Sequence, residues 1–384
     1  MRVITAGESH GECLVAILEG FPKGVRIEEE FINKELRRRQ KGIGRGARMQ
    51  LEEDKVKIIS GMRNKISLGS PIGILVKNRD FKIHPQKEDG LDPLVVPRPG
   101  HADLSGFFKY QEKDLRNILE RASARETAAR VVIGAICKQL LGNFNIKIRS
   151  FVIGVGRVYS HQKPKNVEEI EKRTENSLLN CIDSEKEKLM IEEIEKAKKE
   201  GDTLGGVVEV WAEGVPPGLG SFMHFDRRLD AKLAYYLMSI PAVKGVEIGG
   251  GFEYAKKRGS HSHDEIYFSS QEGFYRKTNN AGGIEGGISN GEPIVVRVAM
   301  KPISTLITPL NSVNLLTGKK EKAAVVRSDV CAISACGVVA ESMVAITLGE
   351  SFLDKFGSDS LKEIEINYNN YMRSISNLMK EAKE

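Results

Sequence analysis

The distribution of hydrophobic positions along the chain predicts several short strands and two medium-length helices. Apolar runs rich in β-branched residues predict strands at 3–5, 56–62, 72–77, 206–213 and 292–300. Residues 13–18 are also continuously apolar and follow the first strand. Helices are predicted at 29–40 and 226–240, the second with Asp226 as its N-cap and Pro241 as its stop.

Two longer helical segments are rich in small residues. The first is predicted at 114–141, with Asp114 as its N-cap and Gly142 as its stop, and the second at 330–349. Because helices with many alanines approach their neighbours closely, we expect both to be central. Each half of the chain thus contains strands and one such helix, which hints at an internal duplication without a detectable sequence repeat. Strands and helices do not alternate strictly, so the pattern favours an α+β fold over a doubly wound sheet.

Length and composition are those of a globular chain. The 384 residues are 40% hydrophobic and 29% charged, enough for one large domain or two ordinary ones. The net charge of +6 is too small to indicate a nucleic-acid-binding protein by itself. The strongly charged segment 165–200 is expected to be a solvated helical excursion without chemistry.

The cysteines and the N-terminus favour a cytoplasmic protein. The five cysteines include no C-x-x-C pair, so we expect reduced thiols and neither disulfides nor a zinc site. The N-terminal sequence MRVITAGESHGE lacks the apolar core of a signal peptide, and no run of roughly 18 apolar residues predicts a membrane span. His261 and His263 have no third ligand at a suitable spacing, so an exposed polar loop is favoured over a metal site.

Two histidines are flanked by glycine in segments suited to ligand contact. His10 follows the first strand in GESHG, and His101 lies in the loop RPGHAD, with the carboxylate of Asp103 two residues on. Imidazole titrates at about pH 6.5, which suits proton transfer near neutrality. From spacing alone, His10 is explained equally well as a turn residue that caps a strand.

Basic residues are concentrated between positions 34 and 48. One acid, Glu35, is outnumbered by Lys34, Arg37, Arg38, Arg39, Lys41, Arg45 and Arg48. Guanidinium groups match phosphate and carboxylate geometry, and the glycines beside Arg45 allow close backbone approach, so a small anion is the favoured ligand. A solvated helix end and a nucleic-acid surface stay open as alternatives, although the segment has no aromatic residues for base stacking.

Three further segments are candidate ligand contacts. Arg121 and Arg125 lie four residues apart on one face of the predicted helix with Ser123 between them, and the alternative is that either arginine pairs with Glu126 or another acid. The glycine-rich stretch 279–291 matches neither the dinucleotide nor the P-loop pattern, although its amides are able to approach a ligand. Arg327 lies just before a predicted helix N-terminus, which favours anions.

Taken in order, these motifs resemble those of chorismate synthases. The resemblance rests on nine segments: TAGESHGE (5–12), RRRQKGIGRGARM (37–49), PRPGHADLSG (97–106), LERASARETAAR (119–130), DTLGG (202–206), SIPAVKGVEIG (239–249), TNNAGGIEGGISNG (278–291), MKPISTL (300–306) and RSDVCA (327–332). They span nearly the whole chain, which implies a single domain covering 1–384. The least family-like part is 143–200, which contains none of them.

The resemblance implies an enzyme of aromatic amino-acid biosynthesis, in the shikimate pathway. Chorismate synthases are carbon–oxygen lyases that convert 5-enolpyruvylshikimate 3-phosphate into chorismate and phosphate by a 1,4-elimination. They require reduced FMN although the reaction has no net redox change. The resemblance also implies a β-α-β sandwich and a cytoplasmic homotetramer, with neither nucleic acid nor membrane as a partner.

The resemblance assigns roles to particular residues. The implied catalytic residues are His10 beside the leaving phosphate, His101 beside the flavin pyrimidine ring and Asp329 near flavin N5. The implied substrate-binding residues are Ser9, Arg39, Arg45, Arg48, Arg125 and Arg327. The implied flavin-binding residues are Arg121, Ala122, Ser123, Pro241, Ala242, Gly286, Lys301, Pro302, Ile303, Ser304, Thr305 and Arg327. Ala122 and Pro241 depart from the serine and asparagine that are frequent in the family, and no metal is implied.

Two other functions are weighed against this interpretation. An NADPH-linked flavin oxidoreductase would transfer hydride with net consumption of NADPH. The chain has no nicotinamide-binding fingerprint, so we expect it to depend on an external source of reduced FMN. A basic RNA-binding module built on 34–48 would bind RNA in a strongly salt-dependent manner.

Overall fold

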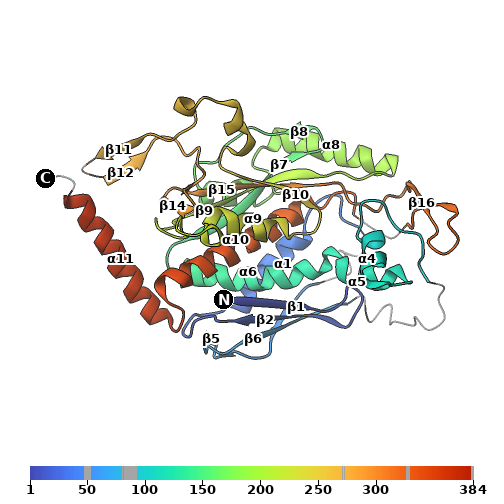
Figure 1. The fold of residues 1–384 in the computed structure, drawn as a ribbon, viewed down its shortest axis with the longest axis horizontal. Helices are drawn as coiled ribbons and strands as arrows, with labels where there is room; N and C mark the ends of the chain where they lie inside the picture. Colours follow the sequence, from blue (N-terminus) through green and yellow to red (C-terminus); the bar gives the residue numbers. More distant parts are fainter. Residues whose placement is uncertain are drawn as a thin grey trace.

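Two antiparallel sheets form the outer layers of the molecule (Figure 1). The computed structural model describes residues 1–46, 53–79, 81, 93–269, 271, 273–325 and 329–381. The first sheet has the strand order β1-β2-β6-β3, and its strands are β1 (Arg2–Ala6), β2 (Cys13–Glu19), β6 (Ile72–Lys77) and β3 (Val56–Ile58). The second has the order β10-β15-β9-β7-β8, and its strands are β10 (Val243–Ile248), β15 (Ile294–Met300), β9 (Gly206–Glu213), β7 (Lys147–Val155) and β8 (Val158–Tyr159).

Three helices lie between the two sheets. They are α1 (Glu29–Gln40), α6 (Thr127–Gly142) and α10 (Ile333–Phe356). Helix α6 contacts β2 and β6 of the first sheet, whereas α10 contacts β7 and β9 of the second, as Figure 1 shows. Along β2, Leu14, Ala16 and Leu18 alternate with more exposed residues and are buried, as expected for a strand with one covered face. The layers therefore run sheet, helices, sheet, and the mixed helix and strand content agrees with the predicted α+β class.

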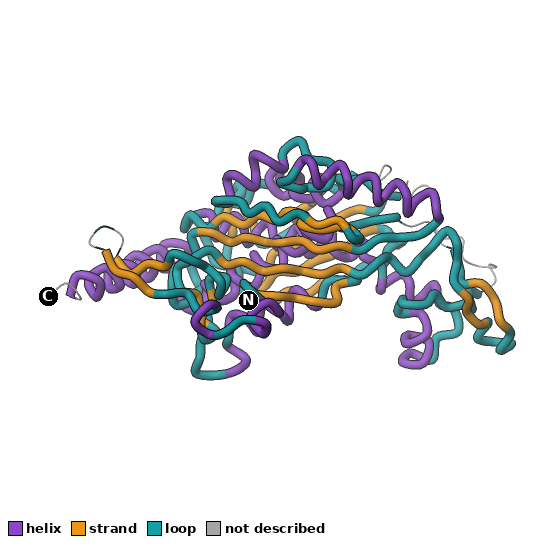
Figure 2. The backbone as a smooth tube through the Cα atoms, turned by 90° about the horizontal axis from the view of Figure 1, so that it is seen from above, coloured by secondary structure: helices purple, strands orange, loops and turns teal. Residues whose placement is uncertain are grey.

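The remaining elements surround this core. The other helices are α4 (Asp103–Tyr110), α5 (Leu115–Ala122), α7 (Val167–Thr174), α8 (Ser184–Glu200), α9 (Leu229–Met238) and α11 (Leu361–Glu381). The other strands form hairpins, namely β4 (Met62–Arg63) with β5 (Ile66–Ser67), β11 (Ile266–Ser269) with β12 (Gly273–Arg276), β13 (Ile284–Glu285) with β14 (Ile288–Ser289), and β16 (Asn311–Val313) with β17 (Lys320–Lys322). Figure 2 shows the strands of the second sheet side by side and α11 extending away from the body.

Most of the predicted strands are confirmed. They correspond to β1, β6, β9 and β15, and β6 and β9 have the predicted bounds. The apolar segment 13–18 forms β2. The single strand predicted at 56–62 is wrong, because the segment divides into β3 and β4. The chain turns between them at Gly61, which has a φ of +80° that residues with a side chain rarely adopt.

The segment 114–141 is not the single helix that was predicted. It contains α5, a 3₁₀ turn at Ala124–Glu126 and α6, with a break at Ser123. Ser123 is extended (φ −66°, ψ 138°), and its Oγ accepts a hydrogen bond from the N–H of Arg125 at 3.3 Å, so it caps a new helical turn. Within an alanine-rich run, a serine can occupy either a helix interior or a cap position. The sequence pattern therefore did not indicate the break at Ser123. The predicted ends are confirmed, since Asp114 caps α5 and α6 ends at Gly142.

Two other helices differ from the prediction at their ends. Helix α9 begins after Arg228, so the predicted cap at Asp226 is wrong and Asp226 lies in a preceding 3₁₀ turn. Helix α10 continues beyond its predicted end because Phe352 and Phe356 of the extra turns are buried. Among the described residues, α10 is the one helix that is long and apolar enough to cross a membrane, but 94% of its apolar window is buried inside the protein.

The charged segment 165–200 is helical as predicted but is not fully solvated. It forms α7 and α8, and Met190, Ile194 and Ala197 of α8 are buried. Both helices contact β7, a strand that the sequence pattern did not predict. The segment therefore covers part of the second sheet.

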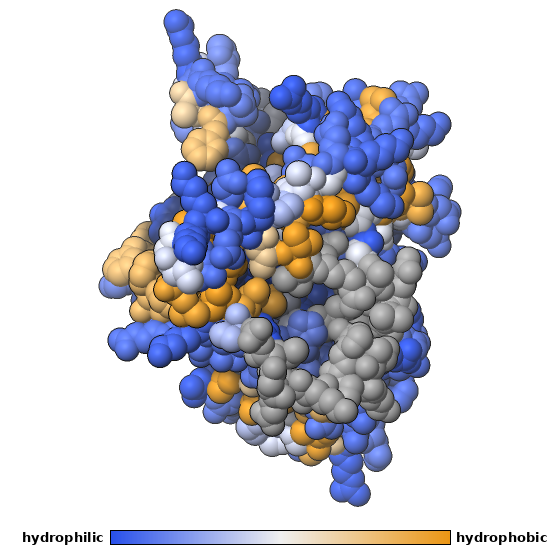
Figure 3. Space-filling model, turned by 90° about the vertical axis from the view of Figure 1, so that its right-hand side faces the viewer, coloured by the Kyte–Doolittle hydropathy of each residue, from blue (hydrophilic) through white to orange (hydrophobic). Residues whose placement is uncertain are grey.

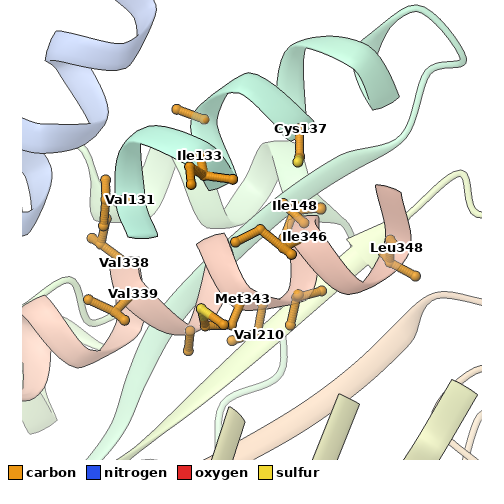
Figure 4. Packing of buried hydrophobic residues seen from close by; sticks show 14 of the residues in the cluster. Val131, Ile133, Cys137, Ile148, Val210, Val338, Val339, Met343, Ile346 and Leu348 are labelled. Atoms are coloured by element: carbon orange, nitrogen blue, oxygen red, sulfur yellow. The ribbon is translucent and has the colours of Figure 1, made fainter. Parts of the chain in front are cut away.

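Helices α6 and α10 pack closely at Gly134. A Cβ atom placed on Gly134 would lie 2.3 Å from Cβ of Ser342 and 2.5 Å from its Cα. Around the two helices, buried side chains such as Val131, Ile133 and Val338 fill the space (Figure 4). The small residues of these two segments thus allow the close approach that the sequence suggested.

We expect the substitution Gly134→Ala to lower the free energy of unfolding by about 1–3 kcal/mol, because the new methyl group forces two packed helices apart. Urea denaturation followed by circular dichroism measures the change. The matched control is Gly142→Ala at the end of the same helix, where an added Cβ meets no atom within 4 Å. Equal stability of the two variants would contradict the packing account.

Five charged side chains between the helices and β7 form what we term the buried charge cluster: the buried Glu35, Lys138 and Glu341, and the half-buried Arg38 and Arg149. Arg38 donates hydrogen bonds to Glu35 at 2.9 Å and to Glu341 at 2.7 Å. Lys138 donates to Glu35 at 2.6 Å and to Glu341 at 2.5 Å. Burial alone would raise the pKa of Glu35, but Lys138 and Arg38 lower it to about 2. The cluster ties α1, α6 and α10 together.

Candidate functional site

A cleft of about 850 Å³ opens beside the N-terminal ends of α6 and α10, whose helix dipoles favour anions. It unites residues from both halves of the chain that the sequence had suggested separately. Those that line it are Ser9, His10, Arg39, Arg45, His101, Ala122, Ser123, Arg125, Pro241, Ala242, Lys301, Ile303, Ser304, Thr305 and Asp329. Figure 3 views the side on which α4, α5 and β16 lie in Figure 1, where hydrophobic side chains gather between charged ones.

His10 is fixed by a carboxylate of α5. Glu120 accepts one hydrogen bond from the backbone N–H of His10 at 2.7 Å and lies 2.6 Å from its Nδ1. Because a carboxylate accepts hydrogen bonds, a proton on Nδ1 of His10 completes this contact. The neighbouring Ser9 donates to the hydroxyl of Ser123 at 3.1 Å, so the break between α5 and α6 also holds this loop.

His101 has a similar carboxylate partner. Its Nδ1 lies 2.5 Å from Oδ1 of Asp103. Asp103 also accepts from the buried Arg98, at Oδ2 from Nε at 2.8 Å and at Oδ1 from Nη2 at 3.0 Å. Burial alone would raise the pKa of Asp103, but the hydrogen bonds from His101 and Arg98 hold it well below its usual range. Asp103 therefore stays ionised and orients the imidazole of His101.

Two arginines of the cleft share one buried carboxylate. Arg125 donates through Nη1 to Oδ1 of Asp54 at 2.6 Å, and Arg39 lies with Nη1 3.6 Å from Oδ2 of the same residue. Burial lowers the pKa of Arg39 to about 10, with Asp54 acting in the opposite direction. At that pKa Arg39 is still charged near neutral pH. The alternative in which an arginine of this patch pairs with an acid is confirmed for Arg125, with Asp54 as the acid, whereas Glu126 pairs with Arg130 at 2.9 Å.

Arg45 and Asp329 face each other across the cleft. Their side chains form an ion pair with Nη1 3.1 Å from Oδ2, and the N–H of Gly46 donates to Oδ1 of Asp329 at 2.6 Å. The Nε of Arg45 is buried and has no hydrogen-bond partner among the described residues. This donor is therefore available to a ligand. The predicted site residues Arg48 and Arg327 lie outside the described residues.

The segment 300–305 forms one wall of the cleft. The Nζ of Lys301 donates to the carbonyl oxygen of Gly100 at 2.9 Å and to Ser304 Oγ at 2.8 Å, which joins this wall to the His101 loop. Burial, followed by the nearby Lys244, lowers the pKa of Lys301. The backbone N–H of Lys301 donates to Ala242, which adopts a φ of +69° that is uncommon for alanine.

Three residues expected at the flavin do not line the cleft of their own chain. Arg121 is directed to the first sheet and donates to the carbonyl oxygen of Thr5 at 2.9 Å. Pro302 is absent from the lining although its neighbours on both sides are present. Gly286 lies instead in a separate hollow of about 620 Å³, with His263 and Asp264 among its walls. Among the described residues, no group of three possible ligands is placed to hold a metal ion.

The sequence did not single out the residues that orient the site, namely Glu120, Asp54 and Asn78. Asp54 and Asn78 flank strands of the first sheet and meet Arg125 only after folding. Glu120 precedes Arg121 by one position, but nothing in that spacing indicates a contact with His10. The loop RPGHAD did carry a signal, because Asp103 follows His101 closely in the sequence.

The arrangement suits a small, multiply charged anion under acid–base control. Arg39, Arg45, Arg125 and Lys301 supply positive charge, and His10 and His101 are each held by a carboxylate. An apolar wall that includes Leu119, Ile240 and Val339 completes the cleft and suits a flat ring system.

Comparisons with known proteins agree with this chemistry. The family model described as chorismate synthase matches residues 1–353. A chorismate synthase of Alkaliphilus metalliredigens is 53% identical over 377 residues, covering 96% of this chain and 99% of the relative. One of Caldanaerobacter subterraneus subsp. tengcongensis is 52% identical over 372 residues, covering 97% and 98%. A solved structure titled as the crystal structure of chorismate synthase is 44% identical, covers 97% of both chains and superposes with a TM-score of 0.79.

Proposed function

Because this chain belongs to the chorismate synthase family, we propose that the cleft is its active site and binds 5-enolpyruvylshikimate 3-phosphate together with reduced FMN. The enzyme is a lyase that removes phosphate from this substrate by 1,4-elimination to give chorismate, in aromatic amino-acid biosynthesis. The observation that supports this location is the meeting of two carboxylate-backed histidines with four arginines in one cleft. The family assignment does not favour an oxidoreductase or an RNA-binding module.

The arginines bind the anionic groups of the substrate. The phosphate and two carboxylates need several cations, and Arg39, Arg45 and Arg125 line the cleft. Each charge-assisted contact contributes about 1.5–3 kcal/mol. We include Ser9, and also Arg48 and Arg327 outside the described residues, in the substrate-binding set. Arg38 and Arg39 of the basic segment are turned into the protein and pair with Glu341 and Thr127, which argues against a continuous basic surface for RNA.

The histidines handle protons. When doubly protonated, His10 donates through Nδ1 to Glu120 and through Nε2 to the leaving phosphate, which it stabilises or protonates. We assign His101, held by Asp103, to the flavin side, where its imidazole would balance the charge of the reduced cofactor. Asp329 relays the proton that leaves the substrate ring. Its present partners, Arg45 and the N–H of Gly46, keep its carboxylate oriented.

The residues present fit a flavin phosphate. The cleft volume of about 850 Å³ falls within the range of about 300–1,000 Å³ typical of cofactor sites. Its apolar wall suits the ring system, and the buried Nε of Arg45 and Nη1 of Arg39 have no hydrogen-bond partner among the described residues. Reduced FMN supplies, when bound, the electron density that helps phosphate to leave. We propose that Ala122, Ser123, Pro241, Ala242, Lys301, Ile303, Ser304 and Thr305 hold it.

The test of this function is anaerobic turnover with chemically reduced FMN. Release of inorganic phosphate and formation of chorismate absorbance are followed together in the presence of 5-enolpyruvylshikimate 3-phosphate. We expect one phosphate per chorismate and no stoichiometric consumption of NADPH. A reaction that consumes NADPH in proportion to product would instead support the flavin oxidoreductase.

We expect FMN to bind only weakly in the absence of substrate. The cations of the cleft complement the anionic groups of the substrate, so bound substrate completes the binding site of the flavin. Titration of flavin absorbance with and without the phosphorylated substrate measures the two affinities. Equal affinity in the two titrations would contradict a shared cleft.

We further propose a cytoplasmic homotetramer that takes reduced FMN from an external source. Exposed aromatic side chains at Phe222, Phe225 and Tyr235 support an association surface near α9. Gly286 and Arg121, which do not line the cleft of their own chain, would contribute to the flavin site only from another subunit or after rearrangement. The single domain over 1–384 and the internal duplication stay proposals of the same kind.

A further inference from the structure

We propose that Asp54 is a positioning residue for this reaction, and that its carboxylate holds the guanidinium groups of Arg39 and Arg125 side by side at the cleft. The proposal rests on the function proposed above, since it concerns how the arginines of that site are arranged. Asp54 does not line the cleft, and its side chain is fully buried behind the two arginines.

Each arginine has one edge tied to the protein body and the other directed to Asp54. Arg39 donates through Nε to Thr127 at 3.0 Å and through Nη2 to the carbonyl oxygen of Ala124 at 3.0 Å. Arg125 donates through Nε to Asn78 at 2.9 Å. Their Nη1 atoms both lie on the side of Asp54, at 2.6 Å for Arg125 and 3.6 Å for Arg39. One carboxylate thus completes the orientation of both groups.

Charge explains why a carboxylate is needed at this position. Arg39 and Arg125 are 4% and 5% exposed, so water screens their mutual repulsion poorly. Burial and the neighbouring Arg125 and Arg45 lower the pKa of Arg39. The negative charge of Asp54 is the main influence that raises this pKa. Without Asp54, two desolvated cations would face each other without a substrate between them, and at least one would turn away.

The contact with Arg39 is looser than the contact with Arg125. The Nη1 of Arg39 and the Oδ2 of Asp54 have no hydrogen-bond partner among the described residues, and 3.6 Å is an ion-pair distance. Arg39 is therefore held near Asp54 by the attraction of opposite charges. Its Nη1 is still able to donate a hydrogen bond to an anionic oxygen. Asparagine at this position would offer Oδ1 to Arg125 but an amino group to Arg39, so Arg39 is the group we expect to move.

The test is the Asp54→Asn substitution in the full chain, assayed anaerobically with saturating reduced FMN. We expect the KM for 5-enolpyruvylshikimate 3-phosphate to rise at least 10-fold, with a smaller fall in kcat and an FMN half-saturation within threefold of wild type. The matched control is Glu209→Gln, which uncouples a buried carboxylate from Arg297 at 2.7 Å on the second sheet, away from the cleft. We expect it to lower stability but to leave KM unchanged.

A KM within twofold of wild type for Asp54→Asn would overturn the proposal. A lower melting temperature with an unchanged KM is what the loss of a purely structural residue would produce. If this variant does not fold, Asp54→Glu keeps the charge and shifts the carboxylate by one methylene. We expect its KM to rise at least threefold, and an unchanged KM overturns the proposal. An inactive wild-type enzyme in the same assay would count against the proposed function itself and not against Asp54 alone.

Discussion

The substitution His10→Ala is expected to lower kcat by 100-fold or more, the scale of a lost general acid. His10 lines the cleft, and Glu120 holds its Nδ1 at 2.6 Å. Loss of the ring leaves the departing phosphate without its proton donor, whereas the arginines that bind the substrate are untouched. The KM for substrate should therefore change much less than kcat. Stopped-flow measurement of chorismate formation with reduced FMN separates the two.

The same experiment on His101→Ala distinguishes the two histidines. We expect a similar loss of turnover, but with a weaker flavin affinity, because His101 is assigned to the flavin side. The control is His161→Ala, which removes an exposed histidine outside the cleft and should leave the rate unchanged. Near-wild-type rates in both cleft variants would overturn the assignment of the two histidines.

The largest effect on stability is expected from Glu341→Gln. This change removes one of the three carboxylates that pair with Arg38, Lys138 and Arg149, the others being Glu35 and the more exposed Glu171. Breaking a buried ion pair by removing one partner typically costs about 3–5 kcal/mol, because the other charges stay buried. Urea denaturation measures the loss. As a control, Glu168→Gln on the exposed pair with Lys147 should change stability by less than about 0.5 kcal/mol.

The buried charge cluster also predicts a pH dependence. The pKa of Glu35 falls from an ordinary 4.5 to about 2 in the folded protein, so its ionised form is favoured by folding. This contribution to stability is present above about pH 4.5 and is lost as the pH falls toward 2. The unfolding free energy of the wild type should fall steeply over that window. Glu341→Gln should flatten the slope, because Glu341 itself titrates far below its usual range in the wild type.

Local patterns were sufficient for the strands and for the segments that form the cleft. The apolar run of β6 and the alternation in β9 depend on nearest neighbours, so their bounds could be predicted. The glycine-flanked His10 and His101 were recognisable for the same reason. The break at Ser123 could not be predicted. Whether this serine lies inside a helix or caps one depends on whether the N–H of Arg125 bonds to a carbonyl oxygen of the preceding turn or to the Ser123 hydroxyl.

Features that depend on tertiary structure were missing from the sequence-based prediction. The buried charge cluster joins Glu35 to Lys138 and Glu341, more than a hundred positions away along the chain. The basic run 34–48 was read as one group, yet folding divides it, because Arg38 turns into the cluster and Arg39 turns toward the cleft. Charge alone does not reveal which side of a helix end faces the interior. The family resemblance, in contrast, suggested the cleft residues of both halves together.

The buried guanidinium groups of the cleft also bear on how the catalytic cycle ends. In the proposed function they bind a substrate with three anionic groups, and the reaction divides it into two anions that would contact the same arginines. Phosphate would then be a product and, at high concentration, a competitor for the vacated site. Because the proposed arginines would bind substrate and products alike, we expect release of the products to be the slow step, which product inhibition by phosphate would reveal.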